Sequence, residues 1–337
     1  MASDRMAAIN ETYENIKRAR RVRAIGGTAL VAVVFGLFLQ ALAAANIFEE
    51  SYQWDFFAQS LRDFFPITTY FGFLPFIDFG RYYAFITERN LLFQPRVGDV
   101  FFSDPIAFFV DELGLFAIFG EAGITLAMGF AGTVMGFPFA LLFGILGSER
   151  VTPFPFNFIF RGTMSAIRAI PALVWVLIYV PLAGLGPASA TLAIATDTVG
   201  NLGRLFVDEL EEIEEGPIEA MRTTGANRPQ TITFGMLSQV TTSFIAWTLY
   251  ILEINVRIAV TVGVYGAGGL GQVLEVQQGL FQFTNTMATL LCIFLLIISV
   301  ELFSQRVRAR LRADEEPMGL VELIRGFPER MAQSIFK

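Results

Sequence analysis

The chain has 337 residues, of which 54% are hydrophobic and 16% are charged, and its formal net charge is −7 at pH 7. Soluble domains usually carry about 25% charged residues, so this composition indicates a polytopic membrane protein, and the excess of acid argues against a nucleic-acid partner. Because the sequence has no His, one Cys and no G-x-x-x-x-G-K-[ST] loop at either Lys, we expect no His-based catalysis, no metal site and no ATP-binding loop in this chain.

The N-terminal third divides into three parts. Residues 1–23 are polar and end in a basic cluster, and residues 24–48 carry no charge, which predicts a cytoplasmic N-terminus followed by a first transmembrane helix. Residues 49–104 are rich in Phe and Tyr and hold no clean span. Within them, residues 54–65 have the pattern of an amphipathic helix at the membrane surface; an ordinary extracytoplasmic loop with a small aromatic core is the alternative. Asp104-Pro105 is typical of a helix start.

The remaining two-thirds holds the other spans. We expect a core of membrane spans over residues 105–305 and a cytoplasmic tail over residues 306–337. Each crossing needs about 20 apolar residues. Five further spans are predicted at residues 122–148, 161–181, 188–202, 231–262 and 285–303. The fold class is therefore all-α, a polytopic membrane protein with about six transmembrane helices.

The basic residues predict the orientation of these spans. With the N-terminus inside, 18 Lys and Arg residues fall in cytoplasmic segments, and 4 fall in the outer segment between the first two spans. Positive charge is concentrated on the cytoplasmic side of membrane proteins. The sequence therefore predicts a multi-pass protein of the cell membrane with both termini in the cytoplasm.

Small residues recur every four positions in the span at residues 122–148, at Gly132, Gly136, Ala140 and Gly144. A helix face made of small residues lets another helix approach closely. We expect internal packing on this face, with a dimer seam as the alternative.

The cytoplasmic segment 208–225 is the most informative loop. Six of its first eight residues are acidic, and the exceptions, Leu210 and Ile213, are three apart as on one helix face. Gly216-Pro217 is expected to end one short helix and start the next, and Gly225 to end the second. These helices form either a docking surface or a plain solvated connector.

Charged residues inside the expected spans are the second group of candidates. Glu253 and Arg257 are four residues apart and are expected to share a helix face as an ion pair, whereas Asn255 points elsewhere. Ionisable groups in spans usually face the bundle interior or a wet cavity. Direct contact with an anionic substrate is the alternative role. Arg168 either meets an oxyanion or extends to the cytoplasmic interface, and Asp197 is its candidate partner.

A glycine-rich segment follows the fifth span. Gly266, Gly268 and Gly271 satisfy the spacing of a dinucleotide-binding fingerprint, and Gly269 lies between them. The fingerprint requires a strand before it and a helix after it, which this context lacks. We therefore expect an irregular, closely packed extracytoplasmic segment next to a cavity or a partner.

The residues from Glu219 to Gly225 resemble the EAA loop of permease subunits of binding-protein-dependent ABC importers. Glu219, Ala220 and Gly225 match this motif at the right spacing, as does Leu237, and Met221 takes the place of its third residue. The resemblance implies that the segment 208–225 contains coupling helices that contact an ATPase subunit, with Glu219, Ala220, Met221 and Gly225 as the contact residues.

A closer resemblance, to the phosphonate branch of these permeases, covers about residues 120–303. It rests on Arg168–Trp175, Gly184–Pro187, Leu249–Arg257 and Val264–Gly271. It implies a type I ABC importer (MetI-like) fold and an importer of phosphonate or a related phosphorus oxyanion that works by alternating access. It also implies two ABC ATPase subunits that bind ATP and Mg²⁺, an extracytoplasmic substrate-binding protein, membrane lipid and a second copy in a homodimer as partners.

Three alternatives stay open. An ABC importer for another small solute, such as an amino acid, is disfavoured by the cluster of Glu253, Asn255 and Arg257. A secondary transporter would show inverted repeats or proton and sodium sites, and a membrane-bound enzyme would need a nucleophile and base.

Overall fold

The computed structural model describes residues 2–47, 52–94, 103, 104, 106, 108 and 114–311, with side chains from Tyr13 onward. Residues 312–337 of the expected tail lie outside the described residues, as do 95–102. Pro105, in the predicted helix start Asp104-Pro105, also lies outside the described residues. The Asp104 side chain accepts a hydrogen bond from the Ile106 N–H at 3.1 Å. The chain forms two units, Met1–Gln59 and Ser60–Lys337, which are described separately.

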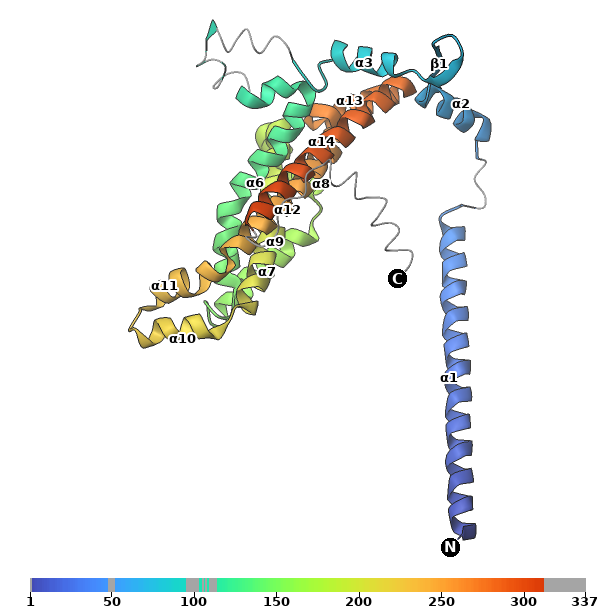
Figure 1. Cartoon of the computed structure of the whole chain (residues 1–337), viewed down its shortest axis with the longest axis vertical. Coiled ribbons are helices and arrows are strands. Elements are labelled where there is room, and N and C mark those ends of the chain that lie inside the picture. The colour runs from blue at the N-terminus through green and yellow to red at the C-terminus, as the bar shows by residue number, and fades with distance from the viewer. Residues whose placement is uncertain are drawn as a thin grey trace. The chain divides into compact units, whose positions relative to one another are not determined.

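The first unit consists mainly of one long helix. Helix α1 (Ala2–Ala44) has 43 residues, so residues 2–23 of the polar segment and residues 24–44 of the predicted span belong to a single helix (Figure 1). Its part from Tyr13 to Ala44 is long and apolar enough to cross a membrane. Apolar side chains along it, such as Leu30 and Phe35, are exposed, which suits contact with lipid.

A small α/β segment opens the second unit. Helix α2 (Trp54–Phe64) crosses the unit boundary and is the amphipathic helix that the sequence predicts. Strands β1 (Ile67–Tyr70) and β2 (Leu74–Ile77) pair antiparallel, with Ile67 opposite Ile77. Helix α3 (Phe79–Glu88) follows and is capped by the side chain of Asp78. The sequence analysis missed this hairpin, because both strands are only four residues long and their apolar residues do not alternate cleanly.

The centre of the bundle is the pair of α6 (Gly120–Gly147) and α9 (Pro187–Glu212), with the 3₁₀ turn η1 (Gly114–Phe119) before α6. A Cβ on Gly136 would lie 2.6 Å from the Ala195 carbonyl oxygen, and one on Gly144 would lie 2.6 Å from Phe206 Cβ. The stripe of small residues therefore packs against α9 of the same chain, which confirms internal packing rather than a dimer seam.

The predicted third span is not one straight helix. Helices α7 (Phe156–Ala169) and α8 (Ala172–Ala183) meet at an angle of 91°. Ile170 is extended, with φ −100° and ψ 117°, because the ring of Pro171 disfavours helical backbone at the residue before it. The expected span at 161–181 is therefore a broken span or a re-entrant pair.

The predicted fourth span and the predicted acidic loop also differ from what the structure shows. Helix α9 continues past residue 202 through most of the acidic block to Glu212, and Leu210 and Ile213 are both buried in one apolar cluster. The chain breaks at Ile213, which is extended, and not at Gly216, which lies in the first turn of α10 (Glu215–Thr223). The acidic residues stay helical because their carboxylates are at least partly exposed and meet polar partners, as in the Arg204–Asp208 pair and the hydrogen bond from Trp247 Nε1 to Glu209 Oε1.

The C-terminal part contains the remaining spans. After α11 (Arg228–Gln230), the π-helical turn η2 (Thr231–Leu237) leads into α12 (Ser238–Val262), as predicted for the fifth span. The irregular turn η3 (Gly263–Ala267) and α13 (Gly269–Gly279) precede α14 (Phe283–Leu311). Helix α14 is longer than the predicted span 285–303 and carries Arg306, Arg308 and Arg310 within it.

Within the described residues, four helices are long and apolar enough to span a membrane, and the bent pair α7–α8 makes a fifth candidate. Helix α9, which holds the predicted fourth span, is not among them. Helices α10 and α11 project from one end of the second unit, whereas α3 and the hairpin lie at its other end (Figure 1). The polar helices α10 and α11 therefore lie at the opposite end of the bundle from the aromatic layer, which consists of α3 and the hairpin.

Candidate functional site

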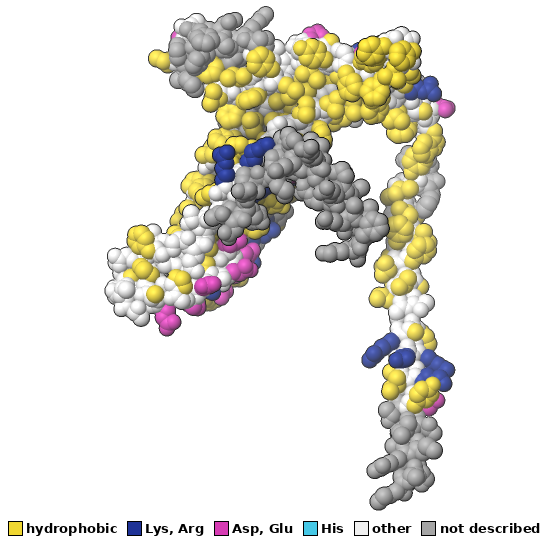
Figure 2. Space-filling model, in the orientation of Figure 1, with side chains coloured by type: hydrophobic (Ala, Val, Ile, Leu, Met, Phe, Trp, Pro, Cys, Tyr) yellow, Lys and Arg dark blue, Asp and Glu magenta, His cyan; other side chains and the backbone are white. Residues whose placement is uncertain are grey.

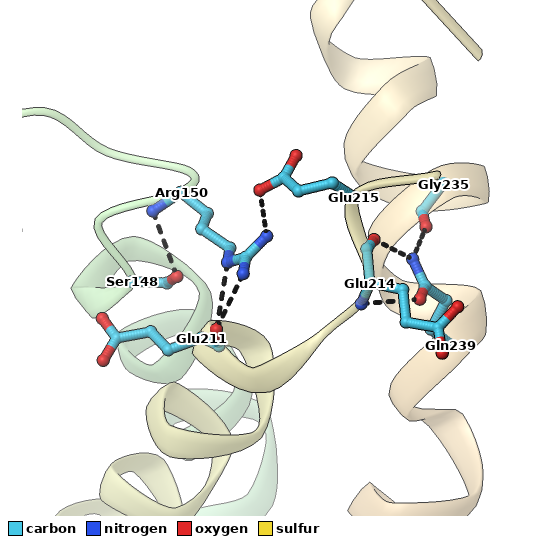
Figure 3. Close-up of polar contacts among 7 residues, drawn as sticks. All are labelled: Ser148, Arg150, Glu211, Glu214, Glu215, Gly235 and Gln239. Atoms are coloured by element: carbon cyan, nitrogen blue, oxygen red, sulfur yellow. Dashed lines mark hydrogen bonds and ion pairs between the residues drawn. The ribbon is translucent and has the colours of Figure 1, made fainter. Parts of the chain in front are cut away.

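Helix α10 is held at its N-terminus by a polar network from three other elements (Figure 3). Arg150, in the turn after α6, contacts Glu215 Oε1 through Nη1 at 2.6 Å and donates to the Glu211 carbonyl oxygen from Nε and Nη2. On the other side, the Glu214 N–H donates to Gln239 Oε1 at 3.2 Å, and Gln239 Nε2 donates to the Gly235 carbonyl oxygen at 2.6 Å. The two ends of the break between α9 and α10 are therefore fixed to α6 and α12.

The candidate coupling residues divide between the two faces of α10. Ile218 is 1% exposed and packs into the bundle, whereas Glu219 and Ala220 are exposed. Met221 is partly buried next to Gly235, where an added Cβ would lie 3.3 Å from Met221 Cγ. Gly225, just after the helix, has φ +80°, a conformation that favours glycine. The structure thus presents Glu219 and Ala220 outward, and Met221 seats the helix on its own chain.

The expected ion pair between Glu253 and Arg257 is wrong. Glu253 is 8% exposed and contacts Arg308 of α14, whose Nη2 lies 2.8 Å from Glu253 Oε1; the contact is ionic, since its geometry falls short of a hydrogen bond. Arg257 instead pairs with Glu301 of α14 at 3.8 Å. Helix α14 runs beside α12 and supplies the partner of each residue, Arg308 for Glu253 and Glu301 for Arg257. The ion pairs therefore join two helices and do not lie along one helix face.

Asn255 lies in the interior of the bundle and is 1% exposed. Its amide nitrogen donates to Thr133 Oγ1 of α6 and to Thr198 Oγ1 of α9, both at 2.8 Å. The sequence analysis placed Asn255 away from its charged neighbours, and the structure confirms that orientation. The side chain joins three helices, so in this single chain it does not face an open cavity.

Arg168 lies at the end of α7 and is exposed. It donates from Nε to Asn201 Oδ1 at 3.2 Å, and Asn201 Nδ2 donates to Asp197 Oδ2 at 2.9 Å. The predicted partner Asp197 is therefore reached through Asn201, a residue that the sequence analysis did not single out. The rest of the guanidinium stays available next to the bend between α7 and α8.

The glycine-rich segment is irregular and closely packed, as predicted. Gly266, Gly268 and Gly269 have φ values of +93°, +101° and +69°. A Cβ on Gly271 would lie 2.0 Å from the Val260 carbonyl oxygen, and one on Gly269 would lie 2.3 Å from Thr125 Oγ1. These contacts fix the turn between α12 and α13 against α6, which is a structural use of the glycines.

The sequence analysis missed Arg150, Glu301 and Arg308 as partners of the candidate residues. Arg150 and Arg308 were counted only among the 18 basic residues of the expected cytoplasmic segments. The spacing of Glu301 and Arg308 along α14, seven residues apart, was a usable signal because it places them on one helix face. Among the described residues, no group of three or more His, Cys, Asp or Glu is arranged to hold a metal ion.

Comparisons with known proteins agree with this geometry. The family model of the binding-protein-dependent transport system inner membrane component matches residues 136–313. A putative phosphite transport system permease protein of Stutzerimonas stutzeri is 35% identical over 200 residues, which are 59% of this chain and 71% of that protein. A putative cryptic phosphonate transport system permease protein of Escherichia coli is 42% identical over 118 residues, 35% of this chain and 96% of that protein.

Two further matches extend the comparison. A phosphate-import permease protein of Mycolicibacterium smegmatis is 33% identical over 202 residues, which are 60% of this chain and 38% of that protein. Among solved structures, a chain of the MetNI methionine ABC transporter in an inward-facing form has a TM-score of 0.51 at 22% identity and covers 57% of this chain and 94% of that chain. At that identity the likeness concerns the fold.

The family model covers more than half of the chain, and the fold contains the apolar helices that such a protein needs. Members of this family work with an ATPase and a substrate-binding protein, and they are the transport subunit rather than the catalytic one. The chain is a multi-pass membrane protein that belongs to the family of binding-protein-dependent transport system inner membrane components.

Proposed function

We propose that this chain is the permease subunit of an ATP-driven importer for phosphonate or a related phosphorus oxyanion. The observation that carries this proposal is the position of the segment Glu219–Gly225, which lies on a helix that projects from the bundle and is fixed to α6 and α12 at its base. The names of the relatives, which are phosphite, phosphonate and phosphate permeases, support the substrate class.

In this proposal α10 is the coupling helix. Glu219 and Ala220 face outward where a partner surface would press against them, and the small Ala220 side chain permits close approach. The network of Arg150, Glu211 and Glu215 would transmit a displacement of α10 to α6 and α9. Two ATPase subunits would bind ATP and Mg²⁺, and their closure would move the spans between outward- and inward-open states.

The substrate pathway is the second part of the proposal. Arg257 and Glu301 lie within helices expected to span the membrane, yet their side chains are 48% and 42% exposed. Charges in spans are costly against lipid and usually face a wet cavity or a partner. We therefore place this face of α12 and α14 towards the pathway in a homodimer, with Arg257 and Arg168 as the cations that meet the oxyanion. Both termini would be cytoplasmic, and the binding protein would deliver substrate at the end that carries α3.

The docking role is tested with Ala220→Glu in the complex of permease and ATPase. Because Ala220 is exposed, the variant should fold with an unchanged unfolding temperature, but ATPase association or stimulated ATP hydrolysis should be lost. Glu212→Gln, an exposed charge change at the end of α9, is the control. Full transport by Ala220→Glu with the ATPase bound as tightly as in the wild type would refute the docking role.

The substrate class is tested by uptake into proteoliposomes that hold the assembled importer and its binding protein. We expect ATP-dependent uptake of phosphonate or phosphite, and competition among phosphorus oxyanions. Arg257→Gln should abolish this uptake while the complex still assembles. Uptake of an amino acid in the absence of any oxyanion uptake would instead support the importer of another solute.

A further inference from the structure

The first inference concerns a cavity at the base of α10, next to the Arg150 network that holds this helix. It has a volume of about 400 Å³ and lies between α10, η2 and the turn after α6. Three arginines line it, Arg150, Arg222 and Arg228, over a floor that includes Thr231 and Met236. The cavity is therefore lined by positive charge, although Arg150 is paired with Glu215.

Two of these arginines are held by backbone carbonyl oxygens, and one of the two, Arg150, also forms an ion pair. Arg228 donates from Nη2 to the Val151 carbonyl oxygen at 2.6 Å, and Arg150 donates from Nε and Nη2 to the Glu211 carbonyl oxygen. A carbonyl oxygen orients a guanidinium without cancelling its charge. The one carboxylate in contact is Glu215, which pairs with Arg150 and is itself 69% exposed.

Arg222 and Arg228 have no ion-pair partner within the part of the chain that the structure describes. An Arg fork matches the geometry of phosphate-type oxygens and binds them through charge-assisted hydrogen bonds. Because Arg150 and Arg228 are held in place before any ligand arrives, the main side-chain ordering on binding would be that of Arg222.

We propose that this cavity is a binding site for a phosphorus oxyanion on the side of α10. It is separate from the transmembrane residues Arg168 and Arg257. The inference rests on the proposed function for its biological meaning, because a bound anion would tie α10 to η2 and restrain the helix when transported product accumulates. Its chemistry does not depend on that function, since the binding can be measured on the permease alone.

The test is calorimetric titration of inorganic phosphate into the purified full chain in nanodiscs of zwitterionic lipid, at constant ionic strength. Arg222→Gln and Arg228→Gln should each weaken binding at least about tenfold. The control Arg204→Gln, whose arginine pairs with Asp208 at 2.8 Å outside the cavity, should bind as the wild type does.

Two further arms identify the source of the anion. If nanodiscs with anionic lipid compete with phosphate, a lipid headgroup is the natural occupant of the same site; if they do not, free oxyanion is. Phosphate binding that is insensitive to Arg222→Gln and Arg228→Gln would overturn the proposal. So would complete loss of binding when the ATPase subunit is added, since the cavity would then be part of the ATPase interface. Unimpaired uptake in these variants would leave the proposed transport function standing.

A second inference comes from the aromatic layer at the opposite end of the unit. One face of α3 packs on α14, with Tyr82 and Phe85 buried in a cluster that includes Ala288. The hairpin and the exposed part of α3 carry large apolar side chains beside the charged Arg81, and Figure 2 shows hydrophobic side chains gathered over this region. The most exposed are Ile67 at 73%, Phe71 at 87%, Phe73 at 78%, Phe76 at 53% and Tyr83 at 70%.

The layer is attached to the end of a membrane span. Phe64 contacts Phe283 at the first residue of α14, with ring centroids 5.0 Å apart, and Thr284 Oγ1 donates to the Asp63 carbonyl oxygen at 2.7 Å. The apolar surface of α14 itself, with Phe294 and Leu295 exposed, continues towards this end. An exposed aromatic surface next to the end of a span lies at the depth where aromatic side chains anchor membrane proteins.

We infer that the hairpin and the exposed face of α3 lie in the bilayer interface, with Phe71 and Phe73 at the turn inserted into it. The full chain, with Cys292→Ala and a single cysteine at Phe73 or at the exposed position Thr223 of α10, is labelled with an environment-sensitive fluorophore in liposomes. The label at Phe73 should emit at shorter wavelength and be quenched by brominated lipid, and the label at Thr223 should not. Equal, water-like emission at both positions, or shielding at Phe73 only after the binding protein is added, would refute insertion.

Discussion

Arg308 of α14 reaches back to Glu253 of α12 and places a guanidinium nitrogen 2.8 Å from a carboxylate that is 8% exposed. One helical turn further along α12, Arg257 pairs with Glu301 of the same neighbouring helix. In the first contact α12 supplies the acid and α14 the base, and in the second contact α12 supplies the base and α14 the acid. They fix the register of α12 against α14, and they differ in burial.

The buried contact should dominate stability. Arg308→Gln leaves Glu253 without a cation in a buried position and should destabilise the protein by about 3–5 kcal/mol, whereas the double variant with Glu253→Gln should be milder. Thermal unfolding in detergent measures both. Coupling between Glu253 and Arg257 should be small, so a double-mutant cycle that shows strong coupling for that pair would restore the same-helix ion pair.

The exposed contact is the matched control. Glu301→Gln removes the partner of Arg257 at a site where both side chains are more than 40% exposed, and in water such pairs contribute less than about 1 kcal/mol. We expect little change in unfolding temperature and a clear change in uptake if this face lines the pathway. Normal uptake by both Glu301→Gln and Arg257→Gln would remove this pair from the pathway.

Asn255 is expected to matter for stability rather than for substrate contact. Replacing it with Leu leaves the hydroxyl groups of Thr133 and Thr198 without the amide that now bonds to both. Both hydroxyls still donate to the carbonyl oxygens of Gly129 and Ile194, so the cost is the loss of two buried hydrogen bonds, about 0.5–1.5 kcal/mol each. Ser299→Ala, which removes an exposed hydroxyl on α14, should be nearly neutral in the same unfolding measurement. Loss of uptake without loss of stability in Asn255→Leu would point to a pathway role.

Close packing between α6 and α9 can be tested at one glycine. Gly136→Ala places a Cβ against Ala195 and Thr198, and overpacking of this kind costs about 1–3 kcal/mol. Gly162→Ala on α7, where nothing lies within 4 Å of the new Cβ, should be neutral or stabilising by up to about 1 kcal/mol. Equal effects of the two substitutions on the unfolding temperature would contradict the packing.

The orientation in the membrane is tested with single cysteines in a Cys292→Ala background. Thr223, on α10, and Leu280, at the end of α13, are both exposed positions. We expect an impermeant thiol reagent to label Leu280→Cys in intact cells and Thr223→Cys only after the membrane is opened. Labelling of Thr223→Cys in intact cells would place α10 outside and overturn both the topology and the docking role.

The sequence by itself determined the membrane class, most of the spans and the location of the α10 segment, because these depend on local properties: apolar length, glycine and proline positions and a short motif. It also indicated which helix face is small and which glycines form an irregular turn. The tertiary structure decided the partners. Glu253 binds Arg308 and not Arg257, Asn255 joins α6 and α9, and Arg168 reaches Asp197 through Asn201. Such pairings depend on which helices lie side by side, and no periodicity within a single helix encodes that.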